Sequence, residues 1–200
     1  MTKLETILQA VAEGRRTPES AAEELRAAME LDLGFARIDL DRGRRCGLPE
    51  VIFSPGKTVP QIVEIMAEMC AAGQNVMATR AGPEVFAAAK ARLPGAVYHE
   101  LARCITLDPV PLPTPEGAVA IVAAGTADLP VAEEAALTAS RMGARVERVY
   151  DVGVAGLHRL MGHVERLRAA RAVVVVAGME GALPSVVGGL VDRPLIAVPT

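Results

Sequence analysis

Apolar residues follow two different spacings in the second half of the 200-residue chain. Strand-like runs that are mostly apolar alternate with helical patterns, in which apolar residues return every three or four positions. Strands that are apolar along their length are buried on both faces, as in a parallel sheet covered by helices. The alternation predicts right-handed βαβ connections and a three-layer α/β/α, flavodoxin-like parallel sheet. We expect the strands at residues 118–124, 146–150, 172–177 and 194–198, and the helices at residues 129–142, 156–170 and 181–190.

The first half of the chain has shorter elements and clear signals for helix starts. Capping residues precede amphipathic patterns at Thr2 with Glu5, at Thr17 before Pro18, and at Thr58 with Gln61. These patterns, with a further helix at residues 83–92, predict a smaller α/β domain. Its strands are expected at residues 50–53, at residues 75–79 and, as one strand, near residues 96–107.

A run with proline at every second position separates the two halves. Residues 108–115 read Asp-Pro-Val-Pro-Leu-Pro-Thr-Pro. Such a run favours extended polyproline geometry and removes hydrogen-bond donors from any strand, so it predicts a semi-rigid linker. We therefore expect an N-terminal α/β domain at residues 1–108, a linker at residues 109–116 and a C-terminal domain at residues 117–200.

Composition excludes several classes of function. Aromatic residues make up only 2% of the chain and the net charge is −3, which disfavours base stacking and binding to nucleic-acid backbones. The three cysteines are odd in number and form no Cys-x-x-Cys pair, which indicates a reducing, cytoplasmic setting without disulfides or a thiolate zinc site. No apolar run approaches 18 residues and the N-terminus is polar, so we expect neither a membrane span nor a signal peptide.

Polar residues follow each strand-like run of the second half. In parallel sheets, ligands bind where strand carboxyl ends meet helix starts, so we expect these turns to share one crevice. The first turn holds Gly125, Thr126 and Asp128 at a helix start, where backbone N–H groups attract anions and Thr126 can bond a phosphate or ribose. Ordinary capping of the helix by Thr126 or Asp128 is the alternative.

The second turn, residues 151–159, holds several groups suited to chemistry. Gly153 and Gly156 let the backbone approach a ligand, while Asp151, His158 and Arg159 supply a carboxylate, an imidazole and a guanidinium. His158 can transfer protons near neutral pH, and Arg159 suits phosphate or carboxylate. A histidine that is simply on the surface or packed in the core is the alternative for His158.

The third turn, residues 178–185, gives the strongest local signal. Glu180 lies between glycines at the end of the most apolar strand, where a carboxylate is costly unless it is paired or used. A raised pKa there would suit a general base, and a solvated turn glutamate is the alternative. In the first half, Ser54-Pro-Gly-Lys57-Thr58 resembles the end of a phosphate loop but lacks its first glycine, so a nucleoside triphosphatase is disfavoured and Lys57 is only a possible phosphate contact.

Longer stretches around these turns resemble the LarB family, the pyridinium-3,5-biscarboxylic acid mononucleotide synthases of nickel-pincer cofactor biosynthesis. The C-terminal half is also similar, more distantly, to the phosphoribosylaminoimidazole carboxylase fold of purine synthesis, at residues 126–128, 157–159 and 178–182. The LarB resemblance covers nearly the whole chain and is carried by residues 47–58, 124–135, 151–159 and 176–190.

The LarB resemblance implies a carboxylase and hydrolase. The pyridinium ring of nicotinic acid adenine dinucleotide is carboxylated with CO2 or bicarbonate, and the phosphoanhydride is hydrolysed to release AMP. We assign Glu180 the role of positioning or deprotonating the water that attacks the phosphoanhydride, with Asp151 as the second choice for this role. His158 is expected to orient a phosphate or to move a proton. No cofactor is expected to bind tightly, and Mg2+ is the one ion considered. We also expect a homo-oligomer, because the related families form octamers. Substrate contacts are expected from Lys57, Gly125, Thr126, Asp128, Gly153, Gly156, Arg159, Gly178, Met179, Gly181, Ala182 and Ser185.

The chain departs from the family pattern at its end. The family's nucleophilic cysteine adds to the pyridinium ring before carboxylation, and it lies in a Gly-rich segment after the Val-Pro-Thr strand end, which here is Thr200. None of Cys46, Cys70 and Cys104 lies in a matching motif, so we expect a truncated chain without that nucleophile. Two other readings stay open: an aminoimidazole ribonucleotide carboxylase or mutase, and a catalytically silent nucleotide-binding module.

Overall fold

The computed structural model describes residues 3–200, and its N-terminal end is a helical hairpin. Thr17 caps the second helix of this hairpin as expected, because its Oγ1 accepts a hydrogen bond from Ser20 N at 3.2 Å. Thr2 lies outside the described residues, so the cap proposed there stays a prediction. The first elements are α1 (Lys3–Ala12), α2 (Pro18–Met29), the antiparallel strands β1 (Glu30–Asp32) and β2 (Arg37–Asp39), and α3 (Arg42–Cys46).

A mixed four-stranded sheet follows, with strand order β3-β4-β6-β5. The expected single strand near residues 96–107 is wrong, because the chain reverses at Arg103, whose φ is 50°, and pairs with itself as two antiparallel strands. The predicted capping box of Thr58 and Gln61 is confirmed at the start of α4. The elements are β3 (Ile52–Phe53), α4 (Val59–Ala71), β4 (Val76–Thr79), α5 (Pro83–Arg92), β5 (Val97–His99) and β6 (Cys104–Leu107).

The second four-stranded sheet is parallel throughout, with strand order β10-β9-β7-β8, which confirms the flavodoxin-like α/β prediction. The single helix expected at residues 156–170 is instead two helices, because the chain breaks at Gly162 and His163. The strands are β7 (Ala118–Ala123), β8 (Arg145–Val149), β9 (Ala172–Ala177) and β10 (Leu195–Pro199). The helices are α6 (Leu129–Arg141), α7 (Leu157–Met161), α8 (Val164–Ala169) and α9 (Ala182–Gly188), with 3-10 turns η1 (Thr126–Asp128) and η2 (Val154–Gly156).

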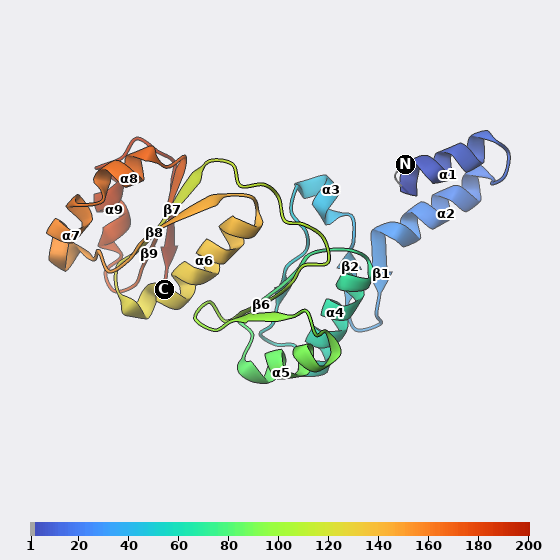
Figure 1. Ribbon diagram of the computed structural model, residues 1–200, viewed down its shortest axis with the longest axis horizontal. Helices are drawn as coiled ribbons and strands as arrows, with labels where there is room; N and C mark the ends of the chain where they lie inside the picture. Colours follow the sequence, from blue (N-terminus) through green and yellow to red (C-terminus); the bar gives the residue numbers. More distant parts are fainter. Residues whose placement is uncertain (1–2) are drawn as a thin grey trace.

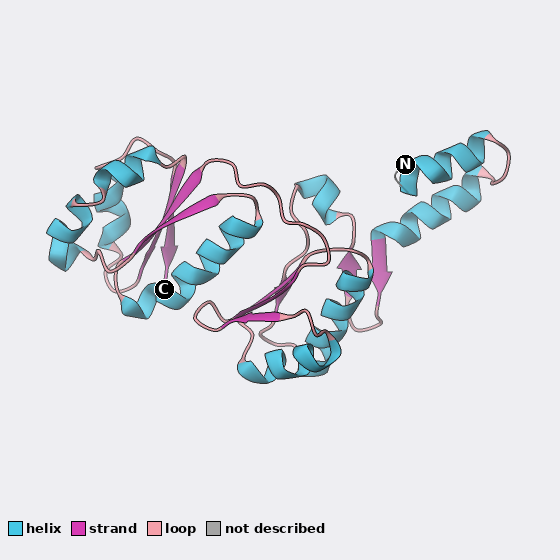
Figure 2. Cartoon of the chain, in the orientation of Figure 1, coloured by secondary structure: helices cyan, strands magenta, loops and turns pink. Residues whose placement is uncertain are grey.

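Alternate residues of β7 pack against helices on opposite faces of this sheet. Ala120 and Val122 belong to a core that includes side chains of α7, α8 and α9. Ile121 and Ala123 belong to a second core with Ala132 and Ala136 of α6. Because side chains alternate along a strand, an apolar run places half of them in each core and gives the three layers seen in Figure 2.

Helix α6 also contacts the mixed sheet of the N-terminal half. Leu137 packs against Met77, Ala102 and Cys104, which lie on the side of β4 and β6 away from α4 and α5. At the end of the helix, Arg141 donates hydrogen bonds to the Asp108 carboxylate and to Val76 O. Helix α6 therefore covers both sheets, as its place between them in Figure 1 shows. Within residues 3–200, no helix is long and apolar enough to cross a bilayer.

Candidate functional site

A cavity of about 590 Å³ lies at the carboxyl ends of the parallel strands. Its lining comes from all three polar turns that follow β7, β8 and β9, together with Thr200 after β10. Strand order reverses between β7 and β9, and this is the switch point at which doubly wound sheets bind ligands. The predicted residues that line it are Gly125, Thr126, Asp128, Gly153, Arg159, Gly178, Met179, Glu180 and Ala182.

Asp128 connects three of the strand ends. Its Oδ2 accepts a hydrogen bond from Gly125 N at 2.9 Å, while its Oδ1 accepts from Gly178 N at 3.1 Å and from the Thr200 hydroxyl at 2.6 Å. The residue is only 7% exposed, so its charge is held by these donors rather than by water. Asp128 makes no side-chain cap on α6, and the N–H groups of Gly125 and Gly178 are already occupied. The bond from Gly125 N is the capping contact of the η1 turn, so the capping role considered for Asp128 is confirmed there, and these contacts occupy the N–H groups of both glycines.

Two glycines allow the turns to approach one another, and a third makes room for Arg159. A Cβ on Gly178 would lie 2.6 Å from Thr200 Oγ1, and a Cβ on Gly153 would lie 3.0 Å from Ala124 O. A Cβ on Gly156 would lie 2.6 Å from Arg159 Nε, so the missing side chain leaves room for the guanidinium. Gly156 is buried and does not line the cavity, so its role is to seat Arg159.

Of the residues predicted for the site, Arg159 is the one with a cationic side chain that lines the cavity. Its Nη1 lies 2.6 Å from Asp151 Oδ2, in a pair in which both side chains are partly exposed. Asp151 itself does not line the cavity and has a φ of 57°, a left-handed conformation that is uncommon outside glycine. His158 is exposed and also lies outside the lining, because successive side chains of a helix point about 100° apart.

Glu180 lies on the rim of the cavity and is exposed to solvent. The turn after β9 carries it away from the apolar strand, with Met179 fully exposed at a φ of 41°. The expectation that Glu180 is desolvated by the buried strand is therefore wrong. Glu180 reaches the cavity from the solvent side, as a turn carboxylate.

Some predicted site residues lie elsewhere. Lys57 Nζ donates to Phe53 O at 2.7 Å, because the tight turn before α4 folds the ammonium back onto its own backbone. Gly181 and Ser185 lie on the turn and on α9 but do not line the cavity. Sequence reasoning missed Thr200, although its place at the carboxyl end of a predicted strand was a usable signal.

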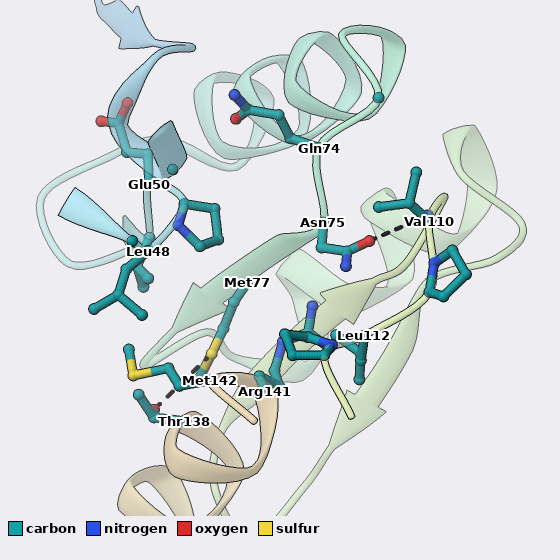
Figure 3. A pocket seen from close by; sticks show the side chains of 17 residues that line it. Leu48, Glu50, Gln74, Asn75, Met77, Val110, Leu112, Thr138, Arg141 and Met142 are labelled. Carbon is teal, nitrogen blue, oxygen red and sulfur yellow. Dashed lines mark hydrogen bonds between the residues drawn. The ribbon is translucent and has the colours of Figure 1, made fainter. Parts of the chain in front are cut away.

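A second cavity, of about 290 Å³, lies between the two sheets (Figure 3). The proline-rich segment forms one wall, held by a hydrogen bond from Val110 N to Asn75 Oδ1 at 3.2 Å. The end of α6 forms another wall with Thr138, Arg141 and Met142. This cavity is at the opposite end of α6 from Asp128, about 18 Å away for a helix of this length.

The cysteines do not provide a nucleophile at either cavity. Cys104 is buried in the first sheet, and burial raises the pKa of its thiol to about 11. Cys46 is exposed on α3, and Cys70 is partly buried on α4. In the described part of the chain, no group of three or more His, Cys, Asp or Glu side chains is placed to hold a metal ion.

Comparisons with known proteins cover most of the chain. A family described as the LarB/PurE-like N-terminal domain matches residues 30–109. A Methanocaldococcus jannaschii protein described as uncharacterized protein MJ0165 is 34% identical over 172 residues, covering 82% of this chain and 67% of that protein. The chain belongs to the LarB-like family. Membership of the LarB-like family indicates a carboxylase-related function of the carboxylase or mutase type, and the aligned length extends well beyond residues 30–109.

Proposed function

We propose that this LarB-like protein acts on nicotinic acid adenine dinucleotide, carboxylating its pyridinium ring and hydrolysing its phosphoanhydride to release AMP. The observation that carries the proposal is the cavity at the β7/β9 switch point, built from the three turns that resemble LarB motifs. Its volume, about 590 Å³, is within the range of pockets that enclose small-molecule ligands. The product would be pyridinium-3,5-biscarboxylic acid mononucleotide, a precursor in nickel-pincer nucleotide synthesis.

The cavity residues divide the work of the hydrolytic half-reaction. Arg159 has guanidinium N–H groups beyond the one facing Asp151, and these suit the diphosphate. Glu180, on the open rim, is placed where water enters and is our candidate to position or deprotonate the attacking water. Thr126, exposed at the start of η1, offers a hydroxyl to a ribose or phosphate.

The carboxylation half-reaction needs a thiolate in the family's chemistry. None of Cys46, Cys70 and Cys104 lines the cavity at the switch point, and the raised pKa of Cys104 keeps that thiol protonated at neutral pH. In this proposal, residues 3–200 contribute the binding crevice and the groups for hydrolysis. Nucleotide binding without turnover is the second candidate function, because no cysteine among the described residues lines the cavity.

The test follows AMP release from nicotinic acid adenine dinucleotide. Because general-base help is typically worth about 100- to 10,000-fold in rate, Glu180→Gln should lower AMP release at least about 100-fold while dinucleotide affinity changes little. Glu165→Gln is the matched control, because Glu165 is an exposed glutamate of α8 that does not line the cavity. AMP release at the wild-type rate in Glu180→Gln would mean that Glu180 is a structural turn residue.

The same assay separates the rival functions. Turnover of aminoimidazole ribonucleotide would identify the purine-type carboxylase or mutase instead. Tight dinucleotide binding with neither AMP nor labelled carboxylate from bicarbonate would identify a nucleotide-binding module.

A further inference from the structure

The two ends of the switch-point cavity carry opposite charges. Asp128 is tied to Gly178 after β9 and to Thr200 after β10, whereas Arg159 is paired with Asp151 after β8. In the strand order β10-β9-β7-β8, these positions lie on opposite sides of β7. Neighbouring strands are about 4.8 Å apart, so the ends of β8 and β9 are about 10 Å apart along the sheet edge, with Asp128 in the turn after β7 between them.

The Asp128 end does not suit phosphate. Phosphates commonly bind at a helix N-terminus through free backbone N–H groups and the helix dipole. Here the N–H groups of Gly125 and Gly178 donate to the Asp128 carboxylate, and that carboxylate offsets the positive end of α6. Because Asp128 is 7% exposed, its charge is poorly screened by water and acts on whatever occupies the adjoining cavity. A cationic group is favoured at this end.

The Arg159 end suits phosphate. Asp151 faces Nη1 of the guanidinium, and the guanidinium has five N–H donors in all. The absent side chain of Gly156 leaves the space in which the guanidinium lies over the η2 turn. Glu180, the other carboxylate of the lining, is exposed, so water and salt screen its charge more strongly than that of Asp128.

We propose that the cavity selects and orients a pyridinium dinucleotide by charge, with the cationic ring beside Asp128 and the diphosphate beside Arg159. The inference rests on the proposed function for the identity of the ligand class. It adds which residue of the cavity recognises the ring and which recognises the diphosphate. Asp128 is then a specificity-determining residue that acts through its buried charge. Thr200 is a positioning residue that holds the carboxylate in place.

The first test uses the unaltered protein and changes only the ring charge. Titration calorimetry at low salt compares nicotinic acid adenine dinucleotide, its reduced dihydropyridine form, and ADP-ribose, which has no pyridine ring. We expect the oxidised form to bind at least about tenfold more tightly than the other two, because only its ring carries the positive charge. Equal affinity for the oxidised and reduced forms would overturn the inference and leave the proposed function intact. Failure of all three to bind would overturn both.

The second test assigns the two ends to their residues. Asp128→Asn removes the charge, so the preference for the oxidised ring should fall below about threefold. Thr200→Ser keeps the hydroxyl that bonds Asp128 Oδ1 and should retain the full preference. Arg159→Gln should weaken all three ligands by a similar factor, about tenfold, and leave the ring preference unchanged. A full ring preference in Asp128→Asn, with a native circular dichroism spectrum, would contradict the assignment.

Discussion

Gly178 is the residue at which the packing of the cavity is most sensitive to a single atom. An added Cβ would lie 2.6 Å from Thr200 Oγ1 and 3.4 Å from Asp128 Oδ1, in the middle of the hydrogen bonds that join β7, β9 and β10. The Thr200 side chain cannot move aside without losing its bond to Asp128. The glycine is therefore required by close approach and not by its backbone angles.

Gly178→Ala should lower the free energy of unfolding by about 1–3 kcal/mol, because an extra methyl group in a filled site forces neighbouring atoms apart. Gly125→Ala is the matched control, because a Cβ there would lie 3.9 Å from Asp128 Oδ2, in ordinary contact. Urea denaturation of both variants measures the difference. Equal losses would show that the turn after β9 yields to the extra atom.

Burial of Cys104 makes the free energy of unfolding depend on pH, and the direction of this dependence follows from the burial. Burial raises the pKa of this thiol from about 9.0 to about 11. The thiol is therefore protonated in the folded protein at pH values where it ionises in the unfolded chain. Its contribution to stability is complete below pH 9 and is lost as pH rises from 9 to 11.

Between pH 8 and pH 10, the wild-type protein should lose about 1 kcal/mol more unfolding free energy than Cys104→Ala. The comparison is made within each protein across pH, so the cost of the substitution itself cancels. Urea denaturation at the two pH values measures the two losses. The same loss in both proteins would show that Cys104 does not couple stability to pH.

Helix α6 is the element that connects the two halves of the chain. Its Ala132 and Ala136 face the parallel sheet, while Leu137 and Arg141 face the mixed sheet and the proline-rich segment. Its first turn follows Asp128, and its last turn lines the cavity between the sheets (Figure 3). The mixed sheet therefore contacts the same helix that begins at the switch-point cavity.

Arg141→Gln tests this connection. The Arg141 side chain is 10% exposed, and its loss leaves Asp108 and Val76 O without their donor. We expect the free energy of unfolding to fall by about 1–3 kcal/mol, because the carbonyl of the buried residue Val76 loses a donor. Arg92→Gln is the control, because the pair of Arg92 and Glu64 is exposed to solvent and should contribute much less to the free energy of unfolding. Similar losses in both variants would contradict a connecting role for Arg141.

At the scale of the whole molecule, we predict that the chain forms a homo-oligomer through the C-terminal sheet. Strand β10 is at the edge of that sheet and exposes Ile196 by 57%. An exposed apolar edge strand presents unpaired N–H and C=O groups with which another chain can pair. The nearby segment 186–190 contains the exposed small residues Gly188 and Gly189, which suit close contact between subunits.

Light scattering coupled to size exclusion should give a mass above that of a monomer. Ile196→Lys should lower the mass, because a charge on the apolar edge opposes its burial. Val97→Lys is the control, since Val97 is exposed by 51% on the edge strand β5 of the other sheet. A monomeric wild-type protein would refute the prediction.

The sequence by itself determined the elements whose signals are local. The apolar runs of β7 and β9, and the caps at Thr17 and Thr58, act through neighbours within a few residues, so their pattern was enough. The α/β alternation then predicted the parallel sheet and the edge at which the polar turns meet. The hairpin of β5 and β6 was missed because its turn depends on the left-handed conformation of Arg103, which no sequence pattern marked.

Only the tertiary structure decided what each polar group of those turns does. Asp128 was expected to contact substrate or cap a helix; it caps the η1 turn through Gly125 N, and residues 50 and 72 positions away supply its other two hydrogen bonds. Lys57 was expected near phosphate and instead bonds its own turn, and α6 packs against both sheets, a contact that no sequence pattern predicted. Hydrogen bonds and packing between distant segments depend on how the sheets and helices come together. Local sequence patterns do not determine which distant residues come into contact.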